Sequence, residues 1–219
     1  MIKNIIFDFG GVLLDLDYNR TWTAMKHLAV VDMNQEHLPD WFVRLSDAFE
    51  IGSIGQESFI WHIQKNASGH IPHAGEIVRA WNSMLLGWQL SKLNFLKSLR
   101  KEYKTYLLSN TNEIHIEWVQ NDLKTNHDIQ DFDTAYFDKT YYSHLIGLRK
   151  PDPAIFRYVL ERNGLIAKET LFIDDSEEHI KIAALLGLNV HHFERNSDLI
   201  SQWQEILSNA SVKGQDLDS

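Results

Sequence analysis

The sequence predicts an α/β fold, a doubly wound, Rossmann-like parallel sheet with an all-helical cap inserted into it. Short apolar runs without polar alternation, such as residues 5–7, are typical of strands buried on both faces of a parallel sheet. Such runs alternate with helical patterns in two separated parts of the chain, and the part between them shows helical periodicity alone. We therefore expect a sheet domain of residues 1–14 and 90–207, a cap of residues 15–89, and a polar, disordered tail at 208–219.

The first strand ends in an acidic side chain. Asp8 directly follows the apolar run and precedes the pair Gly10 and Gly11, which frees the backbone to turn sharply and to approach a ligand closely. A charged side chain at the carboxyl end of a central parallel strand lies where open α/β sheets bind their ligands. The simpler alternative is that Asp8 only caps a turn, because Asp and Gly are ordinary turn residues.

Apolar side chains recur at helical spacing throughout the predicted cap. The sets are Trp22, Met25 and Leu28; Trp41, Leu45 and Ala48; Phe59 and Ile63; and Ile77, Trp81 and Leu85. A tryptophan accompanies each set, the third being Trp61, and we expect one large aromatic side chain per helix to form the core of a small bundle. Glycines at 52 and 55 break the helical pattern and predict a loop that can face a cleft.

The second part of the sheet domain alternates between strand and helix. We expect strands at 105–109, 134–137, 171–173 and 190–193, with an aromatic continuation of the second strand at Tyr141 and Tyr142. We expect helices around 93–99, 114–119, 154–162, 180–186 and 199–207. Capping residues support these assignments, with Asn112 before the second helix and Gly187 after the fourth. Right-handed crossovers then produce a doubly wound sheet.

Polar side chains follow four of these strands or loops. They are Asp8, Ser109 with Asn110, Lys150, and Asp174 with Asp175. Because parallel strands direct their carboxyl ends to the same edge, these groups can meet in one cleft. A carboxylate nucleophile, a hydroxyl donor, a lysine and an acidic pair are the parts needed to attack a phosphate, hold its oxygens, neutralise its charge and bind Mg²⁺.

Each of these residues also has a simpler interpretation. Ser109, Asn110 and Asp175 are suitable helix caps, and Lys150 is suitable as a solvated side chain. The functional interpretation depends on all of these residues occurring together. Each lies at the end of a strand or the start of a loop in the same predicted sheet.

Composition limits the classes of partner. A formal net charge of −9 argues against nucleic-acid binding and against attraction to an anionic membrane. The absence of cysteine excludes disulfides, thiolate catalysis and cysteine-ligated metal. The first residues do not read as a signal peptide, and no apolar run approaches the roughly 18 residues of a membrane span. We expect a cytoplasmic protein that is a monomer or a weak homodimer.

Four motifs in order resemble those of the haloacid dehalogenase superfamily, in its cap-bearing phosphatase branch. They are Phe-Asp-Phe-Gly-Gly-Val at 7–12, Leu-Leu-Ser-Asn-Thr-Asn at 107–112, Gly-Leu-Arg-Lys-Pro at 147–151 and Phe-Ile-Asp-Asp at 172–175. Within the superfamily the chain looks most like a bacterial branch that contains an α-glucose-1-phosphate phosphatase. Gly10, the segment Glu-Ile-Gly-Ser-Ile at 50–54 and the Ser-Asn-Thr-Asn motif carry this narrower resemblance.

The resemblance implies a chemistry for each motif. Asp8 would become aspartyl-phosphorylated, and Ser109 and Lys150 would bind the phosphoryl oxygens. Asp175 would ligate Mg²⁺ beside Asp8, with Asp174 close by. The insert would be a mobile cap that governs the choice of a small phosphorylated metabolite, a sugar phosphate such as a hexose 1-phosphate.

The chain departs from the family pattern at Gly10. Most family phosphatases carry a general acid/base Asp two residues after the nucleophile, and its loss removes a proton transfer worth roughly 10²–10⁴-fold. The backbone carbonyl of Gly10 can still ligate the metal. Asp15, Asp17 or Glu50, a residue of the cap, are the candidates to replace the acid, although Asp15 and Asp17 also suit a cap hinge.

Three functions are compatible with the sequence. The first is a Mg²⁺-dependent phosphatase. The second is a 2-haloacid dehalogenase, which needs no metal, so that the pair Asp174 and Asp175 speaks against it. The third is a phosphate-binding regulatory protein that has lost turnover, which Gly10 favours and the retention of Asp8 and Lys150 opposes.

Overall fold

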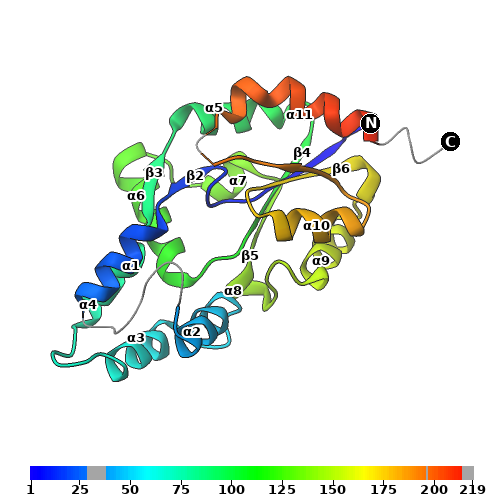
Figure 1. The fold of residues 1–219 in the computed structure, drawn as a ribbon. Helices are drawn as coiled ribbons and strands as arrows, with labels where there is room; N and C mark the ends of the chain where they lie inside the picture. Colours follow the sequence, from blue (N-terminus) through cyan, green and yellow to red (C-terminus); the bar gives the residue numbers. More distant parts are fainter. Residues whose placement is uncertain (29–37, 196, 214–219) are drawn as a thin grey trace.

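A five-stranded parallel sheet forms the centre of the computed structural model, which describes residues 1–28, 38–195 and 197–213 (Figure 1). The strands in spatial order are β5 (Lys139–Tyr142), β4 (Lys104–Ser109), β1 (Asn4–Phe7), β6 (Thr170–Asp174) and β7 (Asn189–His192). The central strand is thus the one that ends at Asp8, as the sequence predicts. Within the described residues, no helix has both the length and the apolar character needed to cross a membrane.

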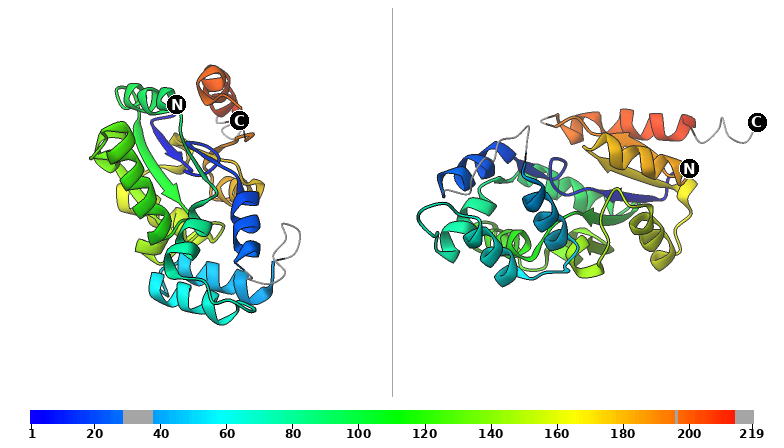
Figure 2. Two further views of the ribbon diagram at one scale, coloured as in Figure 1. Left: turned by 90° about the vertical axis from the view of Figure 1, so that its left-hand side faces the viewer. Right: turned by 60° about the horizontal axis from the view of Figure 1, so that its bottom comes forward.

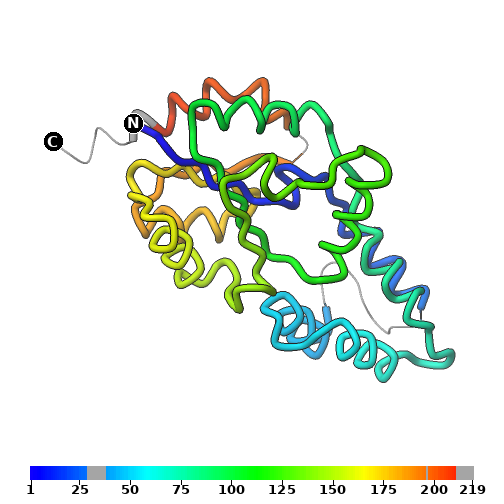
Figure 3. Tube along the Cα trace, turned by 180° about the vertical axis from the view of Figure 1, so that it is seen from behind, coloured from blue at the N-terminus to red at the C-terminus, as the bar shows by residue number. Residues whose placement is uncertain are grey.

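Helices cover both faces of the sheet, which makes it doubly wound. On one face, Ile5 and Phe7 of β1 pack against α5 (Leu90–Leu99), α6 (Glu113–His127), α7 (Phe132–Tyr136) and α11 (Leu199–Lys213). On the other face, Ile6 packs against α9 (Pro153–Asn163) and α10 (Glu177–Leu185). Figure 3 shows α5 and α11 running together along one side of the molecule. Burial on both faces explains why β1 lacks polar alternation.

The cap lies at one end of the molecule, away from the N-terminus (Figures 1 and 2). Its helices are α1 (Tyr18–His27), α2 (Asp40–Glu50), α3 (Gln56–Lys65) and α4 (Ala74–Asn82). The cap is helical as predicted, with one addition at its base. There, β2 (Leu14–Leu16) and β3 (Leu85–Trp88) pair as an antiparallel ribbon. Leu85 is therefore in a strand, and its assignment to the fourth cap helix is wrong.

One tryptophan does not have the predicted place in the core of the cap. Trp61 is 52% exposed, whereas Trp81 and Phe59 are buried. Phe59 stacks on Phe49 with ring centres 4.5 Å apart, so Phe59 rather than Trp61 fills the bundle from α3. The two boundaries predicted between cap and sheet domain, after residues 14 and 89, fall within or directly beside the ribbon. This division into domains stays a prediction.

Two assignments in the second half of the chain are wrong. Residues 134–137 were expected to form a strand, but α7 covers Phe132–Tyr136, because Phe132 and Tyr136, four residues apart, bury one helical face against the core. The strand begins later, at Lys139, and pairs with β4. The tail expected from residue 208 is helical up to Lys213, since Trp203, Ile206 and Ala210 continue one apolar stripe. Residues 214–219 of that tail lie outside the described residues.

Helix α6 of the sheet domain is the main support of the cap. Trp81 of α4 stacks on His115 with ring centres 5.2 Å apart and an interplanar angle of 15°. His115 Nε2 lies 3.2 Å from the Trp81 carbonyl, and its Nδ1 lies 3.2 Å from Asn112 Nδ2, so the hydrogen-bond network assigns the proton to Nε2. Glu113 accepts a hydrogen bond from the N–H of Gln56, the first residue of α3.

Acid is expected to weaken the contact between Trp81 and His115. Burial lowers the pKa of His115 from 6.5 to about 4. Between these pH values the unfolded chain binds a proton that the folded chain does not, so the free energy of unfolding falls as pH falls. The slope is at most about 1.4 kcal/mol per pH unit. Urea unfolding at several pH values should show this component in the wild type and lack it in His115→Gln, whereas identical slopes would contradict the assignment.

Candidate active site

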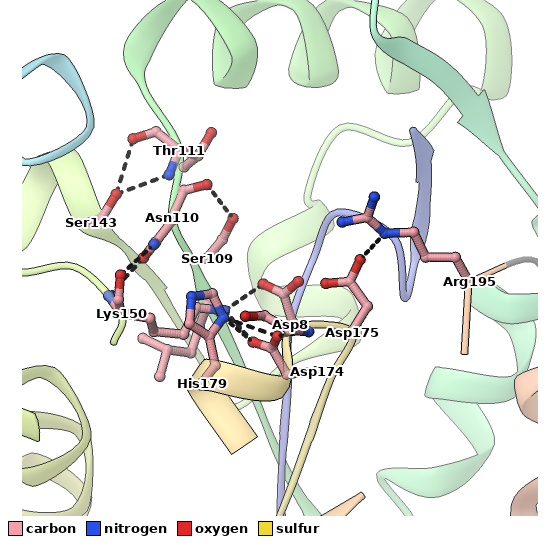
Figure 4. Close-up of polar contacts among 12 residues, drawn as sticks. Asp8, Ser109, Asn110, Thr111, Ser143, Lys150, Asp174, Asp175, His179 and Arg195 are labelled. Carbon is pink, nitrogen blue, oxygen red and sulfur yellow. Dashed lines mark hydrogen bonds and ion pairs between the residues drawn. The ribbon is translucent and has the colours of Figure 1, made fainter. Parts of the chain in front are cut away.

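The carboxyl ends of three neighbouring strands bring the predicted polar residues together (Figure 4). Asp8 follows β1, Ser109 ends β4, and Asp174 ends β6 and is followed by Asp175. The N–H of Asp8 donates to the carbonyl of Ile173 at 2.8 Å, which extends the ladder between β1 and β6 to the site itself. Asp8, Ser109 and Asp174 are buried, so their side chains are held in defined positions by their strands.

Lys150 is the centre of the site. Its fully buried ammonium group donates to Asp8 Oδ1 at 2.5 Å, to Asp174 Oδ2 at 2.7 Å and to the carbonyl of Leu108 at 2.9 Å. All three donor positions of the ammonium are therefore used. The simpler interpretation of Lys150 as a solvated surface side chain is wrong.

Asn110 positions Lys150. Its Nδ2 donates to the Lys150 carbonyl at 2.8 Å, and its Oδ1 accepts from the Lys150 N–H at 2.8 Å. This pair of bonds fixes the loop before Pro151 against the end of β4. Ser109 and Asn110 do not cap the following helix, since Asn112 does, accepting from the His115 N–H at 3.1 Å.

Asp8, Asp174 and Asp175 form a cluster that can hold a metal ion. One carboxylate oxygen from each lies within 4.8 Å of the others. Burial raises the pKa of Asp8 to about 7, with Asp174 and Asp175 adding to the rise and Lys150 opposing it. Three carboxylates gathered this closely repel one another, and oxygen ligands of this kind suit Mg²⁺. The donor set fits the metal that the sequence resemblance implies.

Lys150 and each of its carboxylate partners, Asp8 and Asp174, change each other's pKa. Burial alone would lower the pKa of Lys150, but Asp174 and Asp8 outweigh it and raise the value to about 12. Burial acts to raise the pKa of Asp174, but Lys150 and a hydrogen bond from His179 bring it below the usual range. Lys150 therefore stays a cation, and Asp174 stays an anion, at neutral pH.

Two residues of the site were not identified from the sequence. His179 on α10 places Nδ1 at 2.9 Å and 3.0 Å from the two oxygens of Asp174. Arg195 donates from Nε to Asp175 Oδ2, and its guanidinium lies 5.1 Å from the centre of the Tyr18 ring. His179 lies in the first turn of the helix that follows β6, a position from which a side chain can reach back to the end of the strand. Arg195 carries no comparable signal, because it approaches from beyond β7.

Two adjoining cavities open beside these residues. The polar cavity, about 280 Å³, is lined by Asp8, Lys150, Asp175, Arg149, His179 and Arg195 among others. The apolar cavity, about 210 Å³, is lined by Phe9, Trp22, Trp81, Met84 and Val119, with Ser109, Thr111 and His115. Gly10, Leu16, Tyr18, Glu50 and Asn110 line both.

The three candidate replacements for the missing acid lie in different places. Asp15 accepts from Lys92 Nζ at 3.2 Å and from Gln89 Nε2 at 2.9 Å. Asp17 is the N-cap of α1 and accepts from the Asn19 N–H at 3.0 Å. Neither belongs to the described lining of either cavity, whereas Glu50, at the end of α2, belongs to both.

A side chain would meet different obstacles at Gly10 and at Gly11. Gly11 has a φ of +80°, and a Cβ there would overlap Asp175 Oδ2. Gly10 is outside the left-handed region, and its Cβ would lie 2.5 Å from Leu16 Cδ1, the end of a flexible side chain on the ribbon. The backbone at Gly10 therefore permits a larger residue if Leu16 moves.

Comparison with known proteins agrees with this architecture. The family model of haloacid dehalogenase-like hydrolases matches residues 2–187. A D-ribitol-5-phosphate phosphatase of Bacteroides thetaiotaomicron is 32% identical over 217 residues, covering 95% of this chain and 98% of its own length. A sesquiterpene phosphatase of Aspergillus oryzae is 34% identical over 200 residues, covering 85% and 87%.

Solved structures of HAD family enzymes are also similar to this chain. A HAD family enzyme of Bacteroides thetaiotaomicron, in complex with magnesium and inorganic phosphate, superposes with a TM-score of 0.80 at 36% identity over 90% of this chain and 97% of that one. From its motifs, its fold and these matches, the chain belongs to the haloacid dehalogenase-like hydrolases.

Proposed function

We propose that the protein is a Mg²⁺-dependent phosphatase that hydrolyses a small phosphorylated metabolite through an aspartyl-phosphate intermediate on Asp8. The observation that carries the proposal is the position of Lys150, whose ammonium contacts Asp8 and Asp174 at once at the edge of a three-carboxylate cluster. A lysine held against the nucleophile neutralises phosphate charge where the phosphoryl group is transferred. The relatives named as phosphatases and the relative solved with magnesium and phosphate support the same chemistry.

Each residue has a role in this proposal. Asp8 attacks phosphorus, Lys150 neutralises the phosphoryl oxygens, and Ser109 and Asn110 contribute further contacts to them. Asp8, Asp175 and the carbonyl of Gly10 would hold Mg²⁺, with Asp174 as a ligand or as the partner that orients Lys150. The metal, when bound, would stabilise the charge of the transferring group. The same acidic cluster argues against the dehalogenase alternative, in which a metal site has no use.

The substrate is limited by the apolar cavity. Its volume of about 210 Å³ lies below the roughly 300–1,000 Å³ of pockets that bind drug-sized ligands, so it favours a small organic group. We propose a sugar or polyol phosphate, a hexose 1-phosphate being the choice predicted from the sequence. The relatives leave this open, since one is named for a ribitol phosphate and another for a sesquiterpene phosphate. The cytoplasmic location and the monomeric or weakly dimeric state stay predictions.

Mg²⁺ removal is expected to abolish most of the activity. A screen of the purified protein against phosphorylated metabolites, with and without Mg²⁺, tests the proposal directly. Chelation should lower the rate by roughly 10²–10³-fold, since a metal supplies several kcal/mol of charge stabilisation and each 1.4 kcal/mol is tenfold. Asp175→Ala should raise the Mg²⁺ concentration for half-maximal activity at least tenfold, roughly the effect of a lost metal contact.

Asp198→Ala is the matched control, because Asp198 accepts from the Ile200 N–H at 3.0 Å and belongs to the described lining of neither cavity. Its Mg²⁺ requirement should equal that of the wild type. Full hydrolysis of a phosphate ester after exhaustive chelation would reject the metal-dependent mechanism, whereas metal-independent release of halide from a 2-haloacid, without phosphatase activity, would favour the dehalogenase alternative.

A further inference from the structure

The proposed reaction needs a proton that Gly10 does not supply. When an alcohol leaves phosphorus, its oxygen needs a proton, and when water attacks the aspartyl phosphate, a base must take one. Aryl phosphates need the first proton least, because their leaving groups are already stable as anions. A carboxyl group that reaches the position between the two cavities would serve both steps.

Asp15 and Asp17, two of the three candidates for the general acid, are held by contacts away from the two cavities. Asp15 is bound by Lys92 and Gln89 at the base of the cap, with 39% of its side chain exposed. Asp17 caps α1 and lies 3.7 Å from Arg20, with 40% of its side chain exposed. Both carboxylates therefore stabilise the region where the cap joins the sheet domain.

Glu50 is placed differently. It lines the polar cavity together with Asp8 and Lys150, and it also lines the apolar cavity. Arg149, the neighbour of Lys150 in the chain, donates to Glu50 Oε2 from Nε at 3.0 Å and from Nη2 at 2.9 Å. Both contacts go to the same oxygen, and among the described residues no contact to Oε1 is found. The guanidinium thus fixes a cap carboxyl group beside the proposed phosphate site.

The other titratable groups of the polar cavity are less suitable. His179 is bound through Nδ1 to both oxygens of Asp174, on the metal side of the site, and does not line the described apolar cavity. Tyr18 lines both cavities, but burial raises its pKa to about 12, so that it is a poor acid and an inaccessible base at neutral pH.

We propose that Glu50, delivered by the cap, is the general acid and base of the reaction. The inference rests on the proposed phosphatase function. In the first step Asp8 forms a bond to phosphorus, the bond from phosphorus to the ester oxygen breaks, and that oxygen takes the proton of Glu50. In the second step Glu50 takes a proton from water, the water oxygen attacks phosphorus, and the aspartyl bond breaks. One ester and one water give one alcohol and one phosphate, and Glu50 ends protonated again.

Charges around Glu50 are consistent with this role. Burial raises its pKa above the ordinary value, Arg149 and Lys150 oppose the rise, and Asp47 adds to it. Tyr18 senses the charge of Glu50, and Asp8, Asp175, His179 and Arg195 line the same polar cavity. A glutamic acid with a raised pKa stays partly protonated at pH values closer to neutral, where general acids are efficient.

The experiment compares aryl and alkyl phosphates in pre-steady-state kinetics, with substrate in excess over the full chain and with Mg²⁺. In Glu50→Gln, phosphorylation of Asp8 by ribitol 5-phosphate should slow by roughly 10²–10⁴-fold, whereas phosphorylation by p-nitrophenyl phosphate should slow by less than tenfold. Because the second step then lacks its base, p-nitrophenolate should appear in a burst of one equivalent per site. A merely structural role for Glu50 predicts equal losses and no burst.

Asp47→Asn is the matched control. Asp47 contacts the same guanidinium, at 2.7 Å from Arg149 Nη1, but belongs to the described lining of neither cavity. Because Asp47 only adds to the raised pKa of Glu50, its loss should change the ratio of alkyl to aryl rates far less than Glu50→Gln does, and it should produce no burst. An unchanged ratio of aryl to alkyl rates in Glu50→Gln overturns the inference and leaves the phosphatase function intact. A wild-type protein that hydrolyses no phosphate ester with Mg²⁺ overturns the function itself.

The wild-type enzyme gives a second measurement that does not depend on the folding of a variant. Its phosphorylation rate with the alkyl phosphate should fall relative to the aryl rate as pH rises through the pKa of the acid. Titration of Asp8, Lys150 or other shared groups cancels in this ratio. Parallel pH profiles for the two substrates would overturn the assignment of a general acid.

Discussion

Asp8→Asn is expected to lower kcat by roughly 10⁴–10⁶-fold in a protein that still folds, the range found when an essential nucleophile is removed. An amide cannot form the aspartyl phosphate, because it lacks the attacking carboxylate. Folding should survive, since the change removes one of three neighbouring negative charges from a buried site. The measurements are kcat on p-nitrophenyl phosphate and acid-quench trapping of a phosphorylated protein.

Asp17→Asn is the control for this substitution. It makes the same chemical change at the cap of α1, where the carboxylate accepts from the Asn19 N–H, and kcat should stay at the wild-type value. A folded Asp8→Asn protein with the wild-type rate would exclude covalent catalysis by Asp8.

Lys150→Met is expected to destabilise the fold by about 3–5 kcal/mol, the cost of leaving buried charges without their partner. Asp8 and Asp174 would lose their common cation inside the protein. The loss should be smaller at acid pH, because protonation neutralises the stranded carboxylates, and smaller with added Mg²⁺, which replaces the missing charge. Urea unfolding at pH 5.5 and 8, with and without Mg²⁺, measures both effects.

Lys92→Met separates this effect from the loss of any buried lysine. Lys92 is also buried, with 3% of its side chain exposed, but its partners are the Val12 carbonyl and the half-exposed carboxylate of Asp15. Its loss should cost less and should not respond to Mg²⁺. Equal losses in the two variants, with equal Mg²⁺ responses, would contradict the electrostatic account of Lys150.

The sequence predicted which side chains meet at the edge of the sheet where a single element fixes their position. Asp8 and Asp174 end uniformly apolar strands, and parallel strands direct their ends to one edge, so local patterns were enough to place them together. Lys150 meets them for a related reason, since its loop is tied to the end of β4 by Asn110.

Residues whose position depends on packing between distant elements were harder to predict. Arg195 reaches Asp175 from beyond the last strand, and the pairing of Arg149 with Glu50 joins residues 99 positions apart. Residues 134–137 are rich in β-forming side chains, yet the first three of them are helical because the core accepts Phe132 and Tyr136 from one helical face. Such outcomes are decided by tertiary contacts rather than by local propensity.

The two chain segments that join the cap to the sheet domain are fastened to each other. The buried hydroxyl of Thr21 on α1 donates to the carbonyls of Ala80 and Trp81 on α4, at 3.0 Å each, and accepts from the Met84 N–H at 3.1 Å. Below it, the N–H of Asp17 donates to the Met84 carbonyl at 2.9 Å, and β2 pairs with β3. Two connecting segments that are bonded to each other in this way are expected to move together rather than independently. Any movement of the cap relative to the sheet domain would therefore take place about the ribbon and would carry Glu50 with it.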